Sequence, residues 1–325
     1  MGRWRCALEG MGLNMTSPQD ASVQGAWDRT TTIIVTHHSR AVIGPCLDSV
    51  ARSARIIVVD NESADDTLDI VRERAPRAET IQNQVGVGYG NAASQGLALV
   101  ETEYALLMNP DAEFIGEAFA DLVAEADANP DVGLLSPLLL GDDDDFDRAW
   151  NGPLLLRDKM PSKRDHEPRP EGNFCTWVVS GAVNLVRMSA LRNVGFFDDA
   201  IFLYHEDDDI CLRLMNAGYR ILVVPGAVSH HIGGGSIGSG WGRHWEKFYH
   251  MSWSRLYFEA KYHGLADARV LGWRQLLRFG PKALLIFRPK KAVRDAARFC
   301  GSAAYLLGLP ASKTTKRARP VKEAA

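Results

Sequence analysis

Residues 32–60 read TIIVTHHSRAVIGPCLDSVARSARIIVVD, and this stretch decides the fold. Thr32–Thr36 and Arg55–Asp60 are short runs of β-branched apolar residues, and each ends in polar residues. Between them, Ile43–Ala54 carries apolar residues at helical spacing. Short runs without polar alternation are typical of strands that are buried on both faces in a parallel sheet. The stretch therefore predicts a β-α-β unit.

The alternation of strands and helices continues along the chain, and repeated units of this kind predict an α/β, doubly wound, mostly parallel, Rossmann-like sheet. Further strands are expected near Glu79–Gln82, Tyr104–Met108, Val132–Ser136 and Arg220–Val224, and regular structure is expected to resume at Phe174–Val186. Helices are expected at Thr67–Arg74, Tyr89–Glu101, Glu117–Ala128 and Glu206–Ala217. The acidic, then basic and Pro-rich segment Gly141–Gly172 lacks periodicity and is expected to be a long surface loop.

The composition of the 325 residues is that of an ordinary globular protein, with 46% hydrophobic and 24% charged residues. The formal net charge of −3 gives no indication of a nucleic-acid partner. The five scattered cysteines include no C-x-x-C pair and are expected to be reduced thiols of a cytoplasmic protein. Residues 1–28 lack periodicity and are expected to form a disordered N-terminal extension.

The C-terminal part is expected to be a helical appendage over residues 245–309, followed by a basic disordered tail over residues 310–325. Arg278–Arg298 holds seven basic residues and one acid among apolar residues, which predicts a basic amphipathic helix. Such a helix suits the anionic inner leaflet of a membrane. The alternative is a helix that packs its apolar face on the protein, or an oligomer contact, with its lysines in water.

Two carboxylates follow predicted strands at the edge where functional groups of such sheets gather. Asp60 ends the second strand, in VVDN, and Asp111 follows the strand Tyr104–Met108, in NPD. One carboxylate there can accept hydrogen bonds from a base or ribose, and the other can bind a divalent cation beside a diphosphate. The alternative for each is a turn or capping residue.

Four consecutive acids, Glu206–Asp209, follow the aromatic and apolar run Phe202–His205 and open a predicted amphipathic helix. A helix N-terminus favours carboxylates through its dipole, but capping does not explain four in a row. A carboxylate in a cleft suits a general base that accepts a proton from an attacking hydroxyl. His230 and His231, which precede the glycines 233–235, are candidate metal ligands.

In this order the motifs resemble the inverting family-2 glycosyltransferases of the GT-A fold, in particular their rhamnosyltransferase-like branch. The resemblance covers Thr31 to Trp241, and its most specific blocks are WVVSGA from Trp177, GFFD from Gly195 and EDDD from Glu206, with Arg213 and Gly218-Tyr219-Arg220. It implies a GT-A catalytic domain over residues 29–244.

The resemblance implies roles for individual residues. Asp207 would be the catalytic base, with Glu206 beside it. Asn109-Pro110-Asp111 stands where relatives carry D-x-D, so Asp111 would hold Mg²⁺ or Mn²⁺ with one histidine, for which His231 fits the spacing better than His230. Residues that would bind the nucleotide-sugar are Thr36, Asp60, Asn61, Gly86, Asn91, Asn109, Asp111, Trp177, Ser180 and Gly181.

Two departures from the family pattern affect the donor site. Relatives carry N-x-G-(aromatic)-G-x-x-N-N-x-G after the third strand, whereas this chain has Gln84, Ala92 and Ser94 at three of those positions. The residues after the first strand are His37 and His38, where Tyr-Asn or Phe-Asn is usual. The first departure leaves open the donor contacts of this loop and the identity of the nucleotide, and the two histidines could either meet the base or cap the strand.

The resemblance implies transfer of a sugar, with rhamnose favoured, from a dTDP- or UDP-sugar donor to a saccharide or lipid-linked acceptor in surface polysaccharide biosynthesis. The enzyme would be cytoplasmic or peripheral on the inner face of the cell membrane. One alternative is a sugar nucleotidyltransferase, but such enzymes need a Gly-rich phosphate loop after the first strand, and residues 36–40 contain no glycine. The other is an inactive sugar-nucleotide-binding or scaffold protein.

Overall fold

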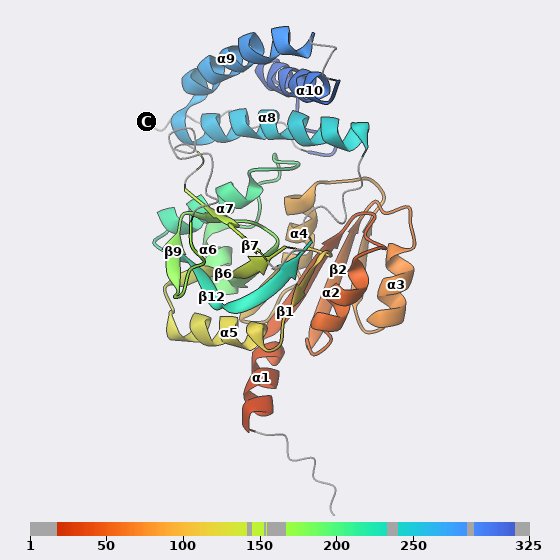
Figure 1. Ribbon diagram of the computed structural model, residues 1–325, viewed down its shortest axis with the longest axis vertical. Coiled ribbons are helices and arrows are strands. Elements are labelled where there is room, and N and C mark those ends of the chain that lie inside the picture. Colours follow the sequence, from red (N-terminus) through yellow and green to blue (C-terminus); the bar gives the residue numbers. More distant parts are fainter. Residues whose placement is uncertain are drawn as a thin grey trace, which may run out of the picture.

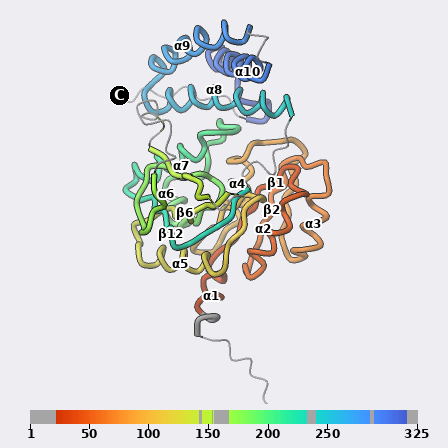
Figure 2. Tube along the Cα trace, in the orientation of Figure 1, coloured from red at the N-terminus to blue at the C-terminus, as the bar shows by residue number. Residues whose placement is uncertain are grey.

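The computed structural model describes residues 18–141, 145–152, 154, 167–232, 240–284 and 289–315. A curled sheet with helices on both faces forms one part, and three helices form a second part beyond one end of the sheet (Figure 1). In Figure 2 the red and orange first half of the sheet lies beside its yellow and green second half, with the blue helices beyond them. The α/β fold class with a helical C-terminal appendage is therefore confirmed.

The predicted β-α-β unit is present. Strand β1 (Thr30–Thr36) pairs in parallel with β2 (Arg55–Asn61), and Thr36 lies opposite Asp60. Helix α2 (Ile43–Ser49) connects the two strands along the chain, and its buried face covers one side of them. This helix ends five residues earlier than predicted, since residues 50–54 turn back toward the start of β2.

The main sheet has ten strands among the described residues, in the order β3-β2-β1-β4-β11-β6-β12-β5, with β7 on β6 and β9 on β12. Pairs among the first four strands of this order are parallel, and so is β6–β12, whereas β11 runs antiparallel to both of its neighbours. The bounds not yet given are β3 (Glu79–Asn83), β4 (Tyr104–Met108), β5 (Ala112–Phe114), β6 (Val132–Leu140), β7 (Phe146–Asp147), β9 (Phe174–Thr176), β11 (Val183–Arg187) and β12 (Arg220–His231). A separate pair consists of β8 (Trp150–Asn151) and β10 (Val178–Val179).

Helices cover both faces of this sheet. Their bounds are α1 (Pro18–Asp28), α3 (Thr67–Arg74), α4 (Tyr89–Leu97), α5 (Ala118–Ala128), α6 (Met188–Val194) and α7 (Glu206–Asn216). Adjacent residues of β1 belong to different cores: Ile34 packs in the cluster that contains α1, α2 and α5, and Ile33 in the one that contains α4, α6 and α7. Burial on both faces explains why the strands lack polar alternation.

Two regions that were predicted to lack helices and strands contain some of them. Residues 18–28 form helix α1, whose Trp27 is buried and stacks on Phe119 of α5 with ring centroids 3.6 Å apart. Residues 145–152 of the predicted surface loop form β7 and β8. Residues 1–17, 142–144, 153 and 155–166 lie outside the described part.

The C-terminal part is a bundle of three helices, α8 (Trp241–His263), α9 (Leu265–Ala283) and α10 (Pro289–Leu306), and each helix contacts the other two. The predicted basic helix Arg278–Arg298 is two helices instead: its start closes α9 and its end opens α10. Residues 310–315, expected to be disordered, pack on the protein with Ala311 and Thr315 buried. Residues 316–325 lie outside the described part. Within the described residues, no helix combines the length and the apolarity that crossing a bilayer requires.

Candidate functional site

The ends of β1 and β2 bring Thr36 and Asp60 together. The Thr36 hydroxyl donates to Asp60 Oδ1 at 2.8 Å, and the backbone N–H of Ser63 donates to Asp60 Oδ2 at 3.1 Å. Both Thr36 and Asp60 are fully buried. The Asp60 carboxylate is therefore fixed at the carboxyl edge of the sheet, as the strand pattern predicts.

Three more of the predicted donor residues fix the loop between β3 and α4. Asn61 Oδ1 accepts a hydrogen bond from the Val87 N–H at 2.9 Å, and Glu62 Oε2 accepts one from the Gly86 N–H at 2.7 Å. Asn91 Nδ2 donates to the Val87 carbonyl at 3.0 Å. In this structure Asn61, Gly86 and Asn91 hold the loop in place through contacts inside the protein.

Asp111 and His231 meet across two strands. Strand β5 starts directly after Asp111 and pairs antiparallel with the end of β12, where His231 lies opposite Ala112. This pairing brings His231 Nε2 to 3.5 Å from Asp111 Oδ1, with Asp111 itself 5% exposed. His230 lies opposite Glu113, and successive side chains of a strand point to opposite faces. The geometry thus pairs Asp111 with His231.

A cleft of ≈ 540 Å³ opens between the sheet, α7 and α8. Of the residues predicted for the site, Asn109, Ser180, Gly181, Glu206 and Asp207 line it. The other lining residues are Tyr89, Asp147, Arg148, Ala149, Asn151, Val178, Val179, Ala182, Leu203, Tyr204, His205, Asp208 and Met251.

Asp207 is held in this cleft by the backbone of Gly181. The Gly181 N–H donates to Asp207 Oδ2 at 3.0 Å, and the Gly181 carbonyl accepts a hydrogen bond from the Tyr89 hydroxyl at 3.1 Å. A Cβ atom at residue 181 would lie 2.5 Å from Asp207 Oδ1. Only glycine therefore allows this approach of the carboxylate to the backbone.

Glu206 differs from its neighbour, because it is buried. Among the contacts of the described residues, its Oε2 has no hydrogen-bonding partner. Burial, together with the negative charge of Asp207, raises the pKa of Glu206 well above its ordinary value. The raised pKa favours the protonated form of Glu206 directly beside Asp207.

The turn before α7 is strained, since Tyr204 and His205 both have positive φ, at 65° and 70°. His205 Nδ1 lies 3.0 Å from Asp208 Oδ2, which ties the turn to the first turn of the helix. Strain of this kind persists where the surrounding structure determines it, and it is common at functional sites.

The last acid of the run, Asp209, is structural. It is fully buried and accepts hydrogen bonds from Arg213, Lys261 and Tyr262 at 2.8, 2.6 and 2.7 Å. The Lys261 ammonium also donates to Asp198 at 2.6 Å. Asp209 thereby connects α7 to α8, and the four acids of the run have separate roles.

Trp177 stands apart from the other predicted residues. It lies between β9 and β10, is 52% exposed and does not line the cleft. Tyr89, Arg148 and Met251 are among the lining residues to which sequence reasoning assigned no role. Tyr89 directly follows Gly88 of the Gly-rich motif, at a position where that pattern specifies no residue type, and Arg148 and Met251 lie in segments without a motif.

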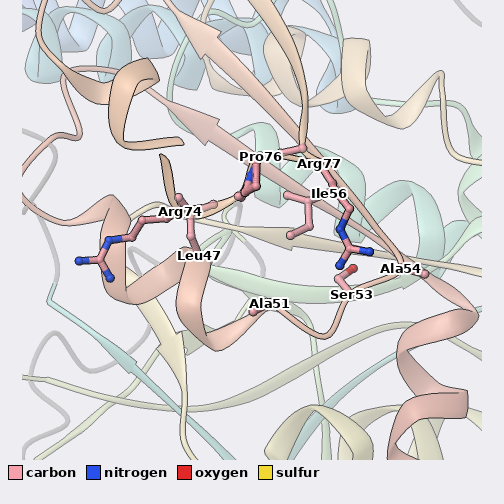
Figure 3. Close-up of a pocket in the computed structure, with 10 residues that line it drawn as sticks. Leu47, Ala51, Ser53, Ala54, Ile56, Arg74, Pro76 and Arg77 are labelled. Atoms are coloured by element: carbon pink, nitrogen blue, oxygen red, sulfur yellow. The ribbon is translucent and has the colours of Figure 1, made fainter. Parts of the chain in front are cut away.

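A second cavity, of ≈ 250 Å³, lies away from these residues (Figure 3). Leu47 and Ala51 of the α2 region, Ser53 before β2, and Pro76 and Arg77 before β3 line it. It therefore lies at the amino ends of the strands, opposite to the edge that carries Asp60. Functional groups of open α/β sheets gather at the carboxyl ends, so we assign it no role.

Asp111 and His231 place a carboxylate and an imidazole side by side, a pair that could hold a metal ion. Within the described residues, no group of three or more His, Cys, Asp or Glu side chains is placed to hold one. A cation that takes few protein ligands and completes its shell with phosphate oxygens and water, as Mg²⁺ does, suits this pair. The donor set fits such a cation when it is bound together with a diphosphate.

Comparison with known families agrees with this architecture. The profile of Glycosyl transferase family 2 matches residues 31–195, which are 165 of the 325 residues. The profile of Glycosyl transferase family group 2 matches residues 171–286. The two matches together span both the sheet and the first part of the bundle.

Two curated relatives come from Mycobacterium tuberculosis. An N-acetylglucosaminyl-diphospho-decaprenol L-rhamnosyltransferase is 26% identical over 273 residues, which cover 76% of this chain and 86% of the relative. A pre-mycofactocin glycosyltransferase is 25% identical over 221 residues, which cover 67% of this chain and 46% of the relative.

Two solved structures share the fold. The mannosyltransferase PcManGT from Pyrobaculum calidifontis, in complex with GDP-Man and Mn²⁺, superimposes with a TM-score of 0.52 at 18% identity, over 86% of this chain and 87% of that one. Residues 1–349 of TarS from S. aureus superimpose with a TM-score of 0.50 at 16% identity, over 90% of this chain and all of that one. The GT-A fold expected from the sequence is confirmed.

Proposed function

The chain belongs to glycosyl transferase family 2 and is a glycosyltransferase, and on this premise we propose that it transfers one sugar with inversion from a nucleotide diphosphate donor to a saccharide or lipid-linked acceptor. The observation that carries the proposal is the Asp207 carboxylate, which lines a 540 Å³ cleft and accepts the Gly181 N–H. A carboxylate held there suits removal of a proton from an acceptor hydroxyl.

In the proposed mechanism, Asp207 accepts the proton of the acceptor hydroxyl while that oxygen attacks the anomeric carbon. The bond from this carbon to the diphosphate breaks on the opposite face, which gives one inversion without a covalent enzyme intermediate. The Gly181 N–H fixes the carboxylate, and the Tyr89 hydroxyl fixes the peptide of Gly181. Burial and the charge of Asp207 raise the pKa of Glu206, which favours placing the negative charge of the pair on Asp207.

The proposed donor site lies along the carboxyl ends of β2, β1 and β4. Asp60 would accept hydrogen bonds from the base or ribose, with Thr36 fixing its orientation, and Asn109 and Ser180 would line the sugar pocket. Asn61, Gly86 and Asn91 would act through the loop that they hold, and Trp177 would contact the acceptor from the rim. The rhamnosyltransferase relative favours dTDP-rhamnose as donor, with a UDP-sugar as the alternative.

The proposed cofactor is Mg²⁺ or Mn²⁺ held by Asp111 and His231, and His230 is not part of this pair. A divalent cation there would neutralise charge on the leaving diphosphate. PcManGT, which shares the fold, was solved with Mn²⁺. The rhamnosyltransferase relative carries a lipid-linked acceptor in its name, which supports a role in surface polysaccharide synthesis and a peripheral location on the inner face of the cell membrane.

The donor test is a titration of the purified protein with dTDP, UDP and GDP, each with and without Mn²⁺. We expect tight binding of one nucleotide only with the metal, and its loss in Asp111→Ala. Equal binding with and without Mn²⁺ would contradict the metal site. Binding of none of the three would contradict the proposed donor class.

The test of the base is turnover of Asp207→Asn with the nucleotide-sugar whose diphosphate binds. A positioned base contributes about 10²–10⁴-fold, so we expect a loss of that size with donor binding retained. Asp121→Asn, at an exposed carboxylate on α5, is the matched control and should keep the wild-type rate. Near-normal turnover in Asp207→Asn would refute the assignment.

A further inference from the structure

Helix α9 carries a stripe of apolar side chains on its outward face. Val270, Trp273, Leu277 and Leu284 follow one another at intervals of three, four and seven residues, and all four are exposed. Trp273 is 61% and Leu277 is 76% exposed. Residues at this spacing lie along one side of a helix. In Figure 1 this helix forms the end of the molecule farthest from the sheet.

The stripe is not needed for packing the bundle. The opposite face of α9 buries Ala268, Gly272 and Phe279 against its neighbours. A Cβ atom at Gly272 would lie 2.9 Å from the Leu306 side chain of α10, so the two helices are in close contact there. Because one apolar face is already used inside the bundle, the outward stripe is a second and separate apolar face.

Cations border this stripe. Arg274, Arg278 and Lys282 are exposed on one flank, and Arg269 is exposed on the other, whereas Asp267 is the one exposed acid in α9. An apolar stripe with tryptophan and leucine, bordered by arginine and lysine, is typical of helices that lie in the interface of an anionic membrane. Long cationic side chains there reach the headgroups while their stems lie on apolar surface.

The cations that border the stripe argue against a second copy of the chain as the partner that covers this face. A symmetric dimer through this face would place the same patch on both sides, and so would bring four cations of one copy against four of the other. An anionic lipid surface instead offers opposite charge to the flanks and hydrocarbon to the stripe.

We propose that the outward face of α9 is a membrane-docking surface that inserts Trp273 and Leu277 into an anionic leaflet and sets Arg274, Arg278 and Lys282 among the headgroups. The inference rests on the proposed function only for the identity of the acceptor. Helix α8 contacts α9 and contributes Met251 to the wall of the cleft. Docking through α9 would therefore bring the cleft to the side from which a lipid-linked acceptor arrives.

The test is flotation of the whole protein with vesicles of phosphatidylglycerol and phosphatidylcholine, compared with vesicles of phosphatidylcholine alone. We expect the protein to float with the anionic vesicles at low salt, and the double variant Trp273→Ser/Leu277→Ser to lose about tenfold or more of this binding. Arg274→Glu/Arg278→Glu should lose it as well. Leu99→Ser, at a 42% exposed leucine between α4 and β4, is the matched control and should float like the wild type.

Nucleotide binding by the same variants separates this inference from the proposed function. Both double variants replace exposed residues far from the cleft, so they should bind the nucleotide diphosphate as the wild type does. Wild-type protein that stays with the soluble fraction at low salt would overturn the inference, and so would a Trp273→Ser/Leu277→Ser variant that floats unchanged. A dimer in size-exclusion chromatography that this variant dissociates, without any flotation, would assign the face to a second copy.

Discussion

Replacing Gly181 with alanine would push the Asp207 carboxylate out of its place while leaving every charged group of the site intact. The new Cβ would lie 2.5 Å from Asp207 Oδ1 and 3.1 Å from Oδ2. Ordinary contact begins at 3.4 Å, so the carboxylate must retreat by about 0.9 Å. This movement also stretches the 3.0 Å hydrogen bond from the Gly181 N–H.

Misplacement of a catalytic group by about 1 Å can cost roughly 10²-fold in rate. We therefore expect Gly181→Ala to lower kcat about 10²-fold. The donor site at Thr36 and Asp60 lies on other strands, so binding of the nucleotide diphosphate should remain within a factor of two or three of wild type.

The assay is transfer under saturating donor, combined with nucleotide titration and thermal unfolding of each protein. Gly226→Ala is the matched control, because a Cβ atom at Gly226 meets nothing within 4 Å. Full activity of a folded Gly181→Ala protein would refute the role given to this contact. Equal loss of activity and of nucleotide binding would indicate a general structural defect instead.

Three further substitutions probe stability. Lys261→Met removes the cation that bridges Asp198 and Asp209, so chemical denaturation should give a free energy of unfolding lower by about 3 kcal/mol, whereas an unchanged value would contradict the bridge. Glu206→Gln should flatten the pH dependence of stability. Because burial raises the Glu206 pKa in the folded state, the unfolded state loses its proton first, and wild-type stability falls by up to about 1.4 kcal/mol per pH unit between the two pKa values. An equal slope in the variant would contradict this. Gly88→Ala places a methyl group against a backbone carbonyl at a φ of 87°, so thermal unfolding should register a loss of at least about 2 kcal/mol, and an unchanged melting temperature would argue against the close packing.

The carboxyl edge of the sheet could be predicted from the sequence, because the alternation of strands and helices fixes which strand ends lie together. Thr36, Asp60 and Asn109 lie at the carboxyl ends of three neighbouring strands, so their common edge needs no knowledge of packing. The pairing of Asp111 with His231 over His230 was predicted from motif spacing, and in the structure the antiparallel pairing of β5 with β12 brings that pair together.

The contact between Gly181 and Asp207 could not be predicted in the same way. It joins residues 26 positions apart, and it depends on how α7 packs against the segment after β10. No periodicity in either segment encodes that distance. The sequence motif indicates which residue types are present, and tertiary packing decides that the peptide N–H meets the carboxylate.

The missed elements are those whose stability comes from distant partners. Strands β7 and β8 have two residues each, too few to create a period-2 pattern, and they form because β6 and β10 supply hydrogen bonds. Helix α1 was missed because the burial of Trp27 depends on Phe119, 92 residues later in the chain. Local sequence patterns therefore fail to predict helices and strands whose stability comes from packing against distant parts of the chain.

The bridge from Lys261 to Asp209 has a consequence for the order in which the protein matures during synthesis. Asp209 precedes Lys261 by 52 residues, so at roughly 5–20 residues per second the ribosome delivers the cation some 3–10 seconds after the carboxylate. Until then, Asp209 has the Arg213 guanidinium of its own helix as a partner, but not the ammonium that links it to Asp198. The contact that joins the helix carrying Asp207 to α8 can therefore form only after the part of α8 that contains Lys261 has emerged from the exit tunnel.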